Sequence, residues 1–171
     1  LRLMRRHYDR QLFADKLKKI KDMMPDAFIG VDVITGMRGE TPDIFEDSFS
    51  FVSGLDVSRL HVFTYSERPS TMALQIPYVV DPRTRHARTR RMTALSSRKL
   101  EEFTRSHIGT VRPVLFEHSL ERNGMMRGFT DNYLRVELPA DEKLFNRVAA
   151  VRLVAPAEEE GIVKGELVDE R

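Results

Sequence analysis

The chain has 171 residues, a formal net charge of +2, 41% hydrophobic and 32% charged residues, and no cysteine. These values are typical of a globular protein with a sizeable core, in one domain or two small ones, and not of a disordered chain. They exclude disulfides and thiolate metal sites within these residues, and no apolar run is long enough to cross a bilayer.

The first expected elements are a helix and an apolar strand. Asp9 can cap a helix that runs to Met24 and is closed by Pro25. Residues 28–34 are almost continuously apolar, which predicts a strand covered on both faces. Asp32 would then be a buried carboxylate, which is costly without a partner, so it marks a candidate site.

A glycine-rich loop at residues 36–40 follows this strand. Glycines let a backbone approach a ligand closely, and the N-terminus of the next helix favours an anion or acceptor. Thr41 and Pro42 supply the cap and first residue of that helix, which Gly54 ends. The spacing matches neither a dinucleotide fingerprint nor a Walker loop, so an ordinary strand-to-helix turn remains an equal alternative.

The next elements complete an α/β pattern. Residues 60–65 form a second apolar strand, a proline-containing loop follows, and a long helix is expected from about Pro82 to Ser106. Strand–loop–helix–strand repetition with polar loops after the strands is how parallel α/β folds build cofactor sites.

The long helix is strongly basic. Residues 83–105 contain eight arginines and lysines against two glutamates. Such a band indicates a polyanion partner, although a solvated helix face with no partner is the alternative.

From Gly109 the composition changes to short β-like runs separated by turn residues. The five runs are Val111–Glu117, Met125–Phe129, Tyr133–Leu138, Phe145–Val154 and Ile162–Val168. Strands at this spacing predict a small barrel or sandwich. We therefore expect two modules, joined near Ile108.

Two segments carry a resemblance to a known family. Residues 30–41 (GVDVITGMRGET) and 61–71 (HVFTYSERPST), with Met4–Tyr8, resemble conserved segments of the radical S-adenosylmethionine methylthiotransferases. Residues 109–168 resemble the TRAM domain, a five-stranded RNA-binding barrel that follows the catalytic domain in that family. Met37 and Arg38 depart from the family's usual Phe-Pro, which leaves the role of Arg38 open.

The resemblance implies a fold and an activity. Residues 1–107 would be the last βα units of a partial, open TIM-like radical S-adenosylmethionine barrel, and residues 108–171 a TRAM barrel. The parent enzyme would methylthiolate threonylcarbamoyladenosine beside the tRNA anticodon, with S-adenosylmethionine and two [4Fe-4S] clusters. This chain lacks the cluster cysteines, so we expect it to be an inactive fragment that binds no cluster. The alternatives are a methylthiotransferase that modifies an aspartate of a ribosomal protein and a non-catalytic RNA-binding module.

The resemblance also implies binding residues for S-adenosylmethionine. Ile34 and Gly36 match the strand-end segment beside the adenine, and Phe63 and Tyr65 match positions that line the same pocket. Arg6 matches an arginine that approaches the methionine carboxylate, which a guanidinium grips with two hydrogen bonds. Ordinary core packing for the aromatic residues and a surface role for Arg6 are the alternatives, and no metal site is expected.

For tRNA, the predicted contacts are arginines together with one exposed aromatic side chain. Cations beside aromatic rings suit the RNA backbone and base stacking. We expect Tyr133 to be exposed and Phe129 to fill the barrel interior. The predicted RNA-binding residues are Arg112, Arg127, Tyr133 and Arg135 in the barrel and Arg88 and Arg91 on the helix.

Two further expectations concern location and assembly. No secretory signal opens the chain, so we expect a cytoplasmic location and no membrane partner. The strand edge at Phe28, Val31 and Val33 would lack the further strands of a complete barrel, so we expect self-association through it.

Overall fold

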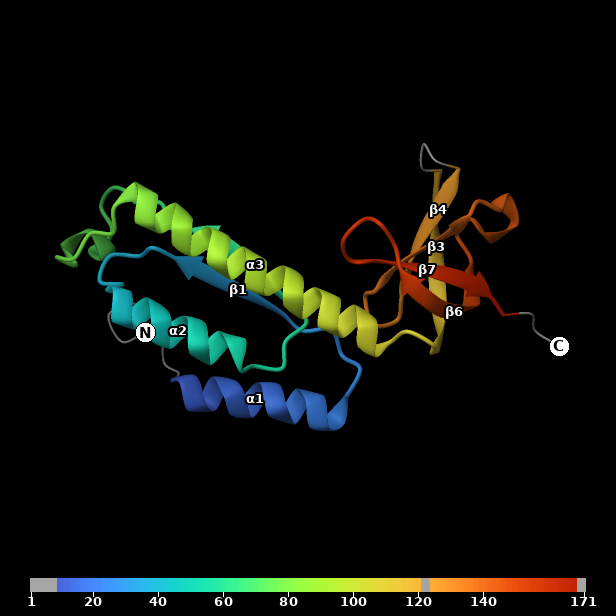
Figure 1. The fold of residues 1–171 in the computed structure, drawn as a ribbon, viewed down its shortest axis with the longest axis horizontal. Coiled ribbons are helices and arrows are strands. Elements are labelled where there is room, and N and C mark those ends of the chain that lie inside the picture. The colour runs from blue at the N-terminus through green and yellow to red at the C-terminus, as the bar shows by residue number, and fades with distance from the viewer. Residues whose placement is uncertain (1–8, 121–123, 169–171) are drawn as a thin grey trace. The chain divides into compact units, whose positions relative to one another are not determined.

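The structure is a computed structural model that describes residues 9–120 and 124–168 (Figure 1). Its contacts divide the chain into two units, Leu1–Arg98 and Lys99–Arg171. The division falls within the long helix, so the expected boundary at residues 107 and 108 remains a prediction about domain organisation. The helices are α1 (Arg10–Met23), α2 (Pro42–Ser53) and α3 (Pro82–Ser106), and the strands are β1 (Gly30–Thr35), β2 (Arg59–Thr64), β3 (Val111–Leu120), β4 (Met125–Thr130), β5 (Arg135–Pro139), β6 (Val148–Pro156) and β7 (Ile162–Leu167). Two short 3-10 helices, Met72–Gln75 and Glu142–Leu144, complete the described elements.

The helix starts form where local sequence predicts them. Asp9 accepts a hydrogen bond from the Leu12 amide at the start of α1, and Thr41 caps α2 directly before Pro42. At α3, Asp81 accepts from the Thr84 amide at 3.0 Å. Each cap satisfies a backbone N–H that has no partner within its own helix. These contacts are local, which is why the sequence predicts them correctly.

The first unit packs its helices against a parallel pair of strands. Strands β1 and β2 run in register from Gly30 opposite Arg59 to Thr35 opposite Thr64. Figure 1 shows α2 and α3 beside β1, with α1 next to α2. The core beneath the helices contains Leu17, Phe45, Leu55, Val57, Leu60, Met92 and Leu95.

The expectation of a strand covered on both faces is wrong for β1. Val31 and Val33 pack against the core, whereas Asp32 and Ile34 between them are exposed. Asp32 is therefore not a buried carboxylate. The reason is that the described helices pack on one face of the two-stranded sheet, so its residues alternate between core and solvent. Since Val31 and Val33 face the core, the exposed apolar surface of this sheet lies at Ile34 rather than at the predicted edge.

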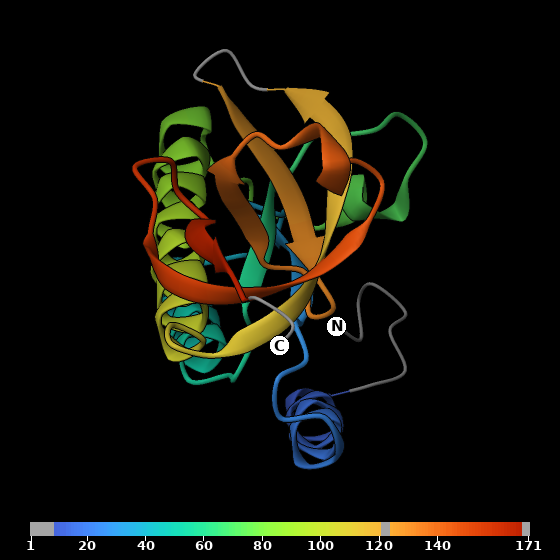
Figure 2. The same ribbon diagram turned by 90° about the vertical axis from the view of Figure 1, so that its right-hand side faces the viewer.

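The second unit is a closed barrel with strand order β3-β4-β5-β7-β6 (Figure 2). The β5–β7 pair is parallel and the other pairs are antiparallel. Its fully buried interior includes Val114, Phe116, Met126, Val136, Val151, Leu153 and Val163. A barrel is thus correct where the sequence also allowed a sandwich. None of the described helices is long and apolar enough to span a membrane.

Candidate functional site

An apolar pair of side chains stands at the carboxyl ends of the two parallel strands. Ile34 of β1 lies directly opposite Phe63 of β2, and their exposed fractions are 47% and 53%. Partners in register on parallel strands point to the same face, so both side chains lie on the exposed face of this sheet. Open α/β sheets bind ligands at the carboxyl ends of their strands. The structure therefore brings together two of the predicted cofactor residues.

The glycine turn lies directly after β1. Gly36 adopts a φ of +76°, and a Cβ atom there would lie 2.2 Å from Cγ of Arg85. Its amide donates to Oε1 of Glu40 at 3.0 Å. Left-handed backbone and close packing both require glycine at this position. The turn thus has one defined conformation, held from within by Glu40.

Arg85 on α3 joins the glycine turn to Tyr65. Its guanidinium donates to the Tyr65 carbonyl at 3.2 Å and lies 5.5 Å from the centre of the Tyr65 ring. The Tyr65 amide in turn donates to the Thr35 carbonyl at 2.9 Å. Tyr65 is half-buried, and its hydroxyl has no hydrogen-bond partner among the described residues. Arg85 is a positioning residue that the sequence analysis missed, because within a basic helix nothing distinguishes it from its neighbours.

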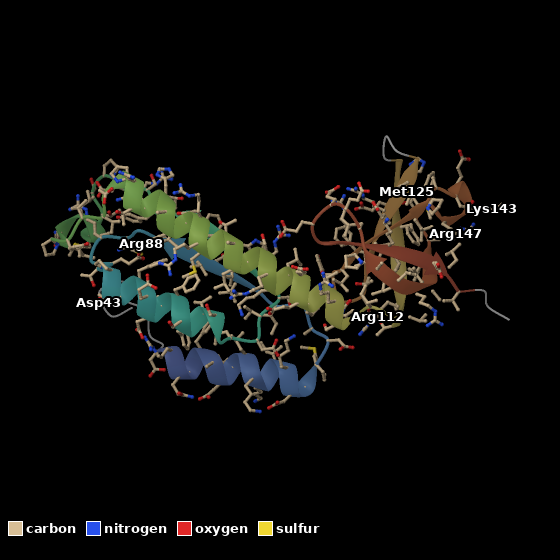
Figure 3. All side chains as sticks on the ribbon, in the orientation of Figure 1. Asp43, Arg88, Arg112, Met125, Lys143 and Arg147 are labelled. Carbon is tan, nitrogen blue, oxygen red and sulfur yellow. The ribbon has the colours of Figure 1, made fainter. Side chains whose placement is uncertain are left out.

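Arg88 corrects one prediction. Its side chain is buried and forms an ion pair with Glu40 at 2.8 Å, with a second hydrogen bond to the Glu40 carbonyl at 2.6 Å. Its guanidinium also lies 5.1 Å from the centre of the Phe45 ring. Figure 3 shows Arg88 between α3 and α2, turned toward the protein. The charge of Arg88 is therefore compensated by the carboxylate that holds the glycine turn, and it is not exposed in the way that the predicted contact with RNA requires.

Arg91 is half-exposed, but its guanidinium already forms an ion pair and ring contacts within the protein. It pairs with Glu46, and this hydrogen bond raises the pKa of Arg91 and lowers the pKa of Glu46. Its guanidinium also stacks against Phe45 and Phe49 at 4.9 and 4.7 Å. A role for Arg91 in RNA binding stays a prediction.

Arg38, whose role the sequence left open, connects two loops. Its Nε donates to Glu67 at 2.8 Å and its Nη1 donates to the Leu74 carbonyl at 2.8 Å. The hydrogen bond from Arg38 lowers the pKa of Glu67. The glycine turn is thereby tied to the segment that follows β2.

Two of the predicted barrel arginines have little exposed surface and lie beside carboxylates. Arg127 is buried and pairs with Glu159 at 2.6 Å and with Glu137 at 3.5 Å, so it does not offer an exposed charge as predicted. The Arg112 side chain, labelled in Figure 3, is 15% exposed and lies 3.6 Å from Asp131. Sequence alone does not distinguish these arginines from exposed ones, because their acidic partners Asp131, Glu159 and Glu137 lie 10 to 32 residues away in the chain.

Two aromatic residues of the barrel, Tyr133 and Phe129, lie on its outer surface. Tyr133 is 72% exposed, as expected, and its ring centre lies 5.8 Å from that of Phe129. The expectation that Phe129 fills the interior is wrong, because its register partner Leu115 is 51% exposed while Val114 and Phe116 beside Leu115 point inward. Arg135 lies over the Phe129 ring at 5.8 Å.

Two site predictions concern Arg6 and metal binding. Arg6 lies outside the described residues. Within residues 9–120 and 124–168, no three His, Cys, Asp or Glu side chains are grouped so that they could hold a metal ion.

The comparisons with known proteins find relatives along most of the chain. No family profile matches the chain. By direct sequence similarity, however, the chain is homologous to a part of the tRNA methylthiotransferases, which confirms the resemblance carried by residues 30–41 and 61–71.

Particular relatives can be named. The chain is 32% identical over 157 residues to the threonylcarbamoyladenosine tRNA methylthiotransferase MtaB of Bacillus subtilis, covering 90% of this chain and 35% of that protein. It is 31% identical over 153 residues to a tRNA-2-methylthio-N(6)-dimethylallyladenosine synthase of Wolinella succinogenes, with the same two coverages. A synthase of the latter name from Bacillus subtilis is 29% identical over 158 residues. The chain thus spans about a third of the length of the curated relatives it matches.

Proposed function

We propose that the chain is part of a radical S-adenosylmethionine methylthiotransferase that modifies tRNA, at threonylcarbamoyladenosine. The observation that carries the proposal is the similarity over 90% of the chain to enzymes named as tRNA methylthiotransferases. In this proposal the first unit contributes βα units to a TIM-like barrel, and the second unit is a TRAM domain. The two-stranded parallel sheet and the closed five-stranded barrel are compatible with those assignments.

The residues at the strand ends fit the cofactor. Ile34 and Phe63 offer an apolar surface to a flat adenine ring, and the Gly36 turn lets the backbone approach it closely. Arg85 and Glu40 hold this turn and Tyr65 in place. When bound, S-adenosylmethionine supplies the methyl group and the source of the radical.

The residues of this chain do not provide ligands for the iron–sulfur clusters. Its 171 residues contain no cysteine, so it provides no thiolate to an iron–sulfur cluster. We accordingly propose that this chain alone has no methylthiotransferase activity, and that its contribution is to position cofactor and tRNA.

The test combines nucleoside analysis with cofactor binding. Deletion of the gene should abolish the 2-methylthio form of threonylcarbamoyladenosine in total tRNA, measured by mass spectrometry, and the full-length gene should restore it. Ile34→Asp in the full-length protein should weaken S-adenosylmethionine binding in calorimetry, because it places a charge against the adenine. Ile44→Asp is the matched control, since Ile44 is similarly exposed, at 50%, but lies on α2. Equal affinities of the two variants would remove Ile34 from the site.

The same nucleoside analysis separates the alternatives. Loss of the 2-methylthio group from dimethylallyladenosine would assign the activity named for the Wolinella relative. Loss of an aspartate modification from a ribosomal protein would assign the ribosomal-protein activity, which none of the relatives named above supports. Unchanged nucleosides and proteins would leave a non-catalytic RNA-binding module.

A further inference from the structure

A row of side chains crosses four strands on the outer surface of the barrel. Register pairs Val148 of β6 with Leu115 of β3, Leu115 with Phe129 of β4, and Phe129 with Arg135 of β5. Leu115 and Val148 are 51% and 65% exposed. The row is therefore an apolar strip that ends in a guanidinium.

The apolar members of this strip, Leu115, Phe129 and Val148, line a groove of about 530 Å³. Tyr133 also lines the groove, and its turn holds its backbone in place. Its φ is +66°, its amide donates to the Thr130 carbonyl at 3.1 Å, and the next amide donates to the Thr130 hydroxyl at 2.8 Å. A left-handed backbone is uncommon for residues other than glycine and clusters at functional sites. The turn thus presents the ring outward in advance of any ligand.

The charges around the groove specify its occupant. Glu117 and Asp131 line it, so a phosphate inside would face two carboxylates. Arg135 instead stands where the strip ends, beside the Phe129 ring. A neutral, flat group inside the groove avoids the two carboxylates, and an anion attached to that group can pair with Arg135.

We propose that this groove binds one unpaired base of the tRNA substrate, stacked on Tyr133 and the apolar strip, with the adjoining phosphate at Arg135. The inference rests on the proposed function, which supplies tRNA as the partner. Bases stack on aromatic side chains, and barrels of this size use an outer strand face to hold unpaired nucleotides. Paired bases cannot enter, since their faces are covered by their neighbours, so the groove distinguishes loop nucleotides from a helical stem.

The test uses the full 171-residue chain and an RNA hairpin that carries 2-aminopurine in its unpaired loop, compared with a fully paired duplex. Binding should quench the 2-aminopurine fluorescence, and the hairpin should bind more tightly than the duplex. Tyr133→Asn removes the ring but tolerates the left-handed backbone, and it should weaken hairpin binding about 5- to 100-fold. Tyr133→Phe should retain binding, and Leu115→Asp should lose it.

Leu167→Asp is the matched control, because Leu167 is 46% exposed on β7 of the same barrel but lies outside the groove. Equal binding of hairpin and duplex, or an unchanged affinity of Tyr133→Asn, would overturn the proposal. So would a lack of hairpin binding at low salt, which would leave the groove to an apolar segment of a protein. If the full-length protein restores tRNA modification while Tyr133→Asn binds the hairpin normally, only this inference fails. If the wild-type gene modifies no tRNA, the proposed function fails instead.

Discussion

Replacing Arg88 by methionine should destabilise the first unit strongly. Methionine keeps most of the contact with the Phe45 ring but leaves the Glu40 carboxylate, whose side chain is 13% exposed, without its counter-charge. Removing one partner of a buried ion pair costs about 3–5 kcal/mol. We expect a loss of that size in the free energy of unfolding, measured by urea denaturation.

Arg91→Met is the matched control for this prediction. Arg91 lies one turn along α3, contacts the same Phe45 ring and also pairs with a glutamate, but its side chain is 46% exposed. Solvent-exposed pairs contribute little and are screened by salt. Arg91→Met should therefore change stability only slightly, and that small effect should fade at high salt. Circular dichroism at a helical wavelength follows the first unit, since α1 and α2 lie there and the described barrel strands contribute little helicity.

A second substitution tests the physical cause. Glu40→Gln removes the charge but retains a side-chain oxygen that can accept from the Gly36 amide. In the Arg88→Met background it should recover part of the lost stability, because no uncompensated charge remains. The reasoning would be refuted if Arg88→Met cost no more stability than Arg91→Met. It would also be refuted if the double variant, Arg88→Met with Glu40→Gln, were less stable than Arg88→Met alone.

Three other outcomes are expected. Gly128→Ala should cost about 3 kcal/mol and unfold the barrel at lower urea, because its Cβ would lie 2.4 Å from a β3 carbonyl oxygen. Gly124→Ala, whose Cβ would meet no described atom within 4 Å, should cost about 1 kcal/mol for its positive φ. The hydrogen bonds from Thr84 lower the pKa of Asp81 below its usual 3.8, so this cap stabilises α3 above that pH and is lost as pH falls through the lowered value. When helicity is followed by circular dichroism as acid is added, the wild type should lose the stabilisation by this cap and Asp81→Asn should not. Equal titration curves would contradict the role of the Asp81 charge. The exposed strand face predicts self-association of the chain that Ile34→Lys weakens, which light scattering over a concentration series would detect; a monomeric wild type at high concentration would oppose it.

Local chemistry in the sequence determined the secondary structure. The bounds of α3 follow from a capping acid before Pro82 and from an apolar periodicity that persists to Ser106. The five barrel strands lie where turn residues separate short apolar runs. Such signals act between residues close in sequence, so they can be recognised without the tertiary structure. The same is true of residues 30–41 and 61–71, whose order of residue types alone carried the resemblance.

Burial and partnership were decided only by the tertiary structure. Arg88 and Arg91 are equivalent in the sequence, yet one is buried against a carboxylate 48 residues away and the other is half-exposed. Phe129 lies on the outer surface of the barrel because the strand register pairs it with Leu115, which is exposed, and not with the inward-facing Val114 or Phe116. Asp32 is exposed because helices pack on one face of its sheet. Each of these outcomes depends on which distant segments pair, and pairing between distant strands and helices is set by the packing of the whole core rather than by local preference.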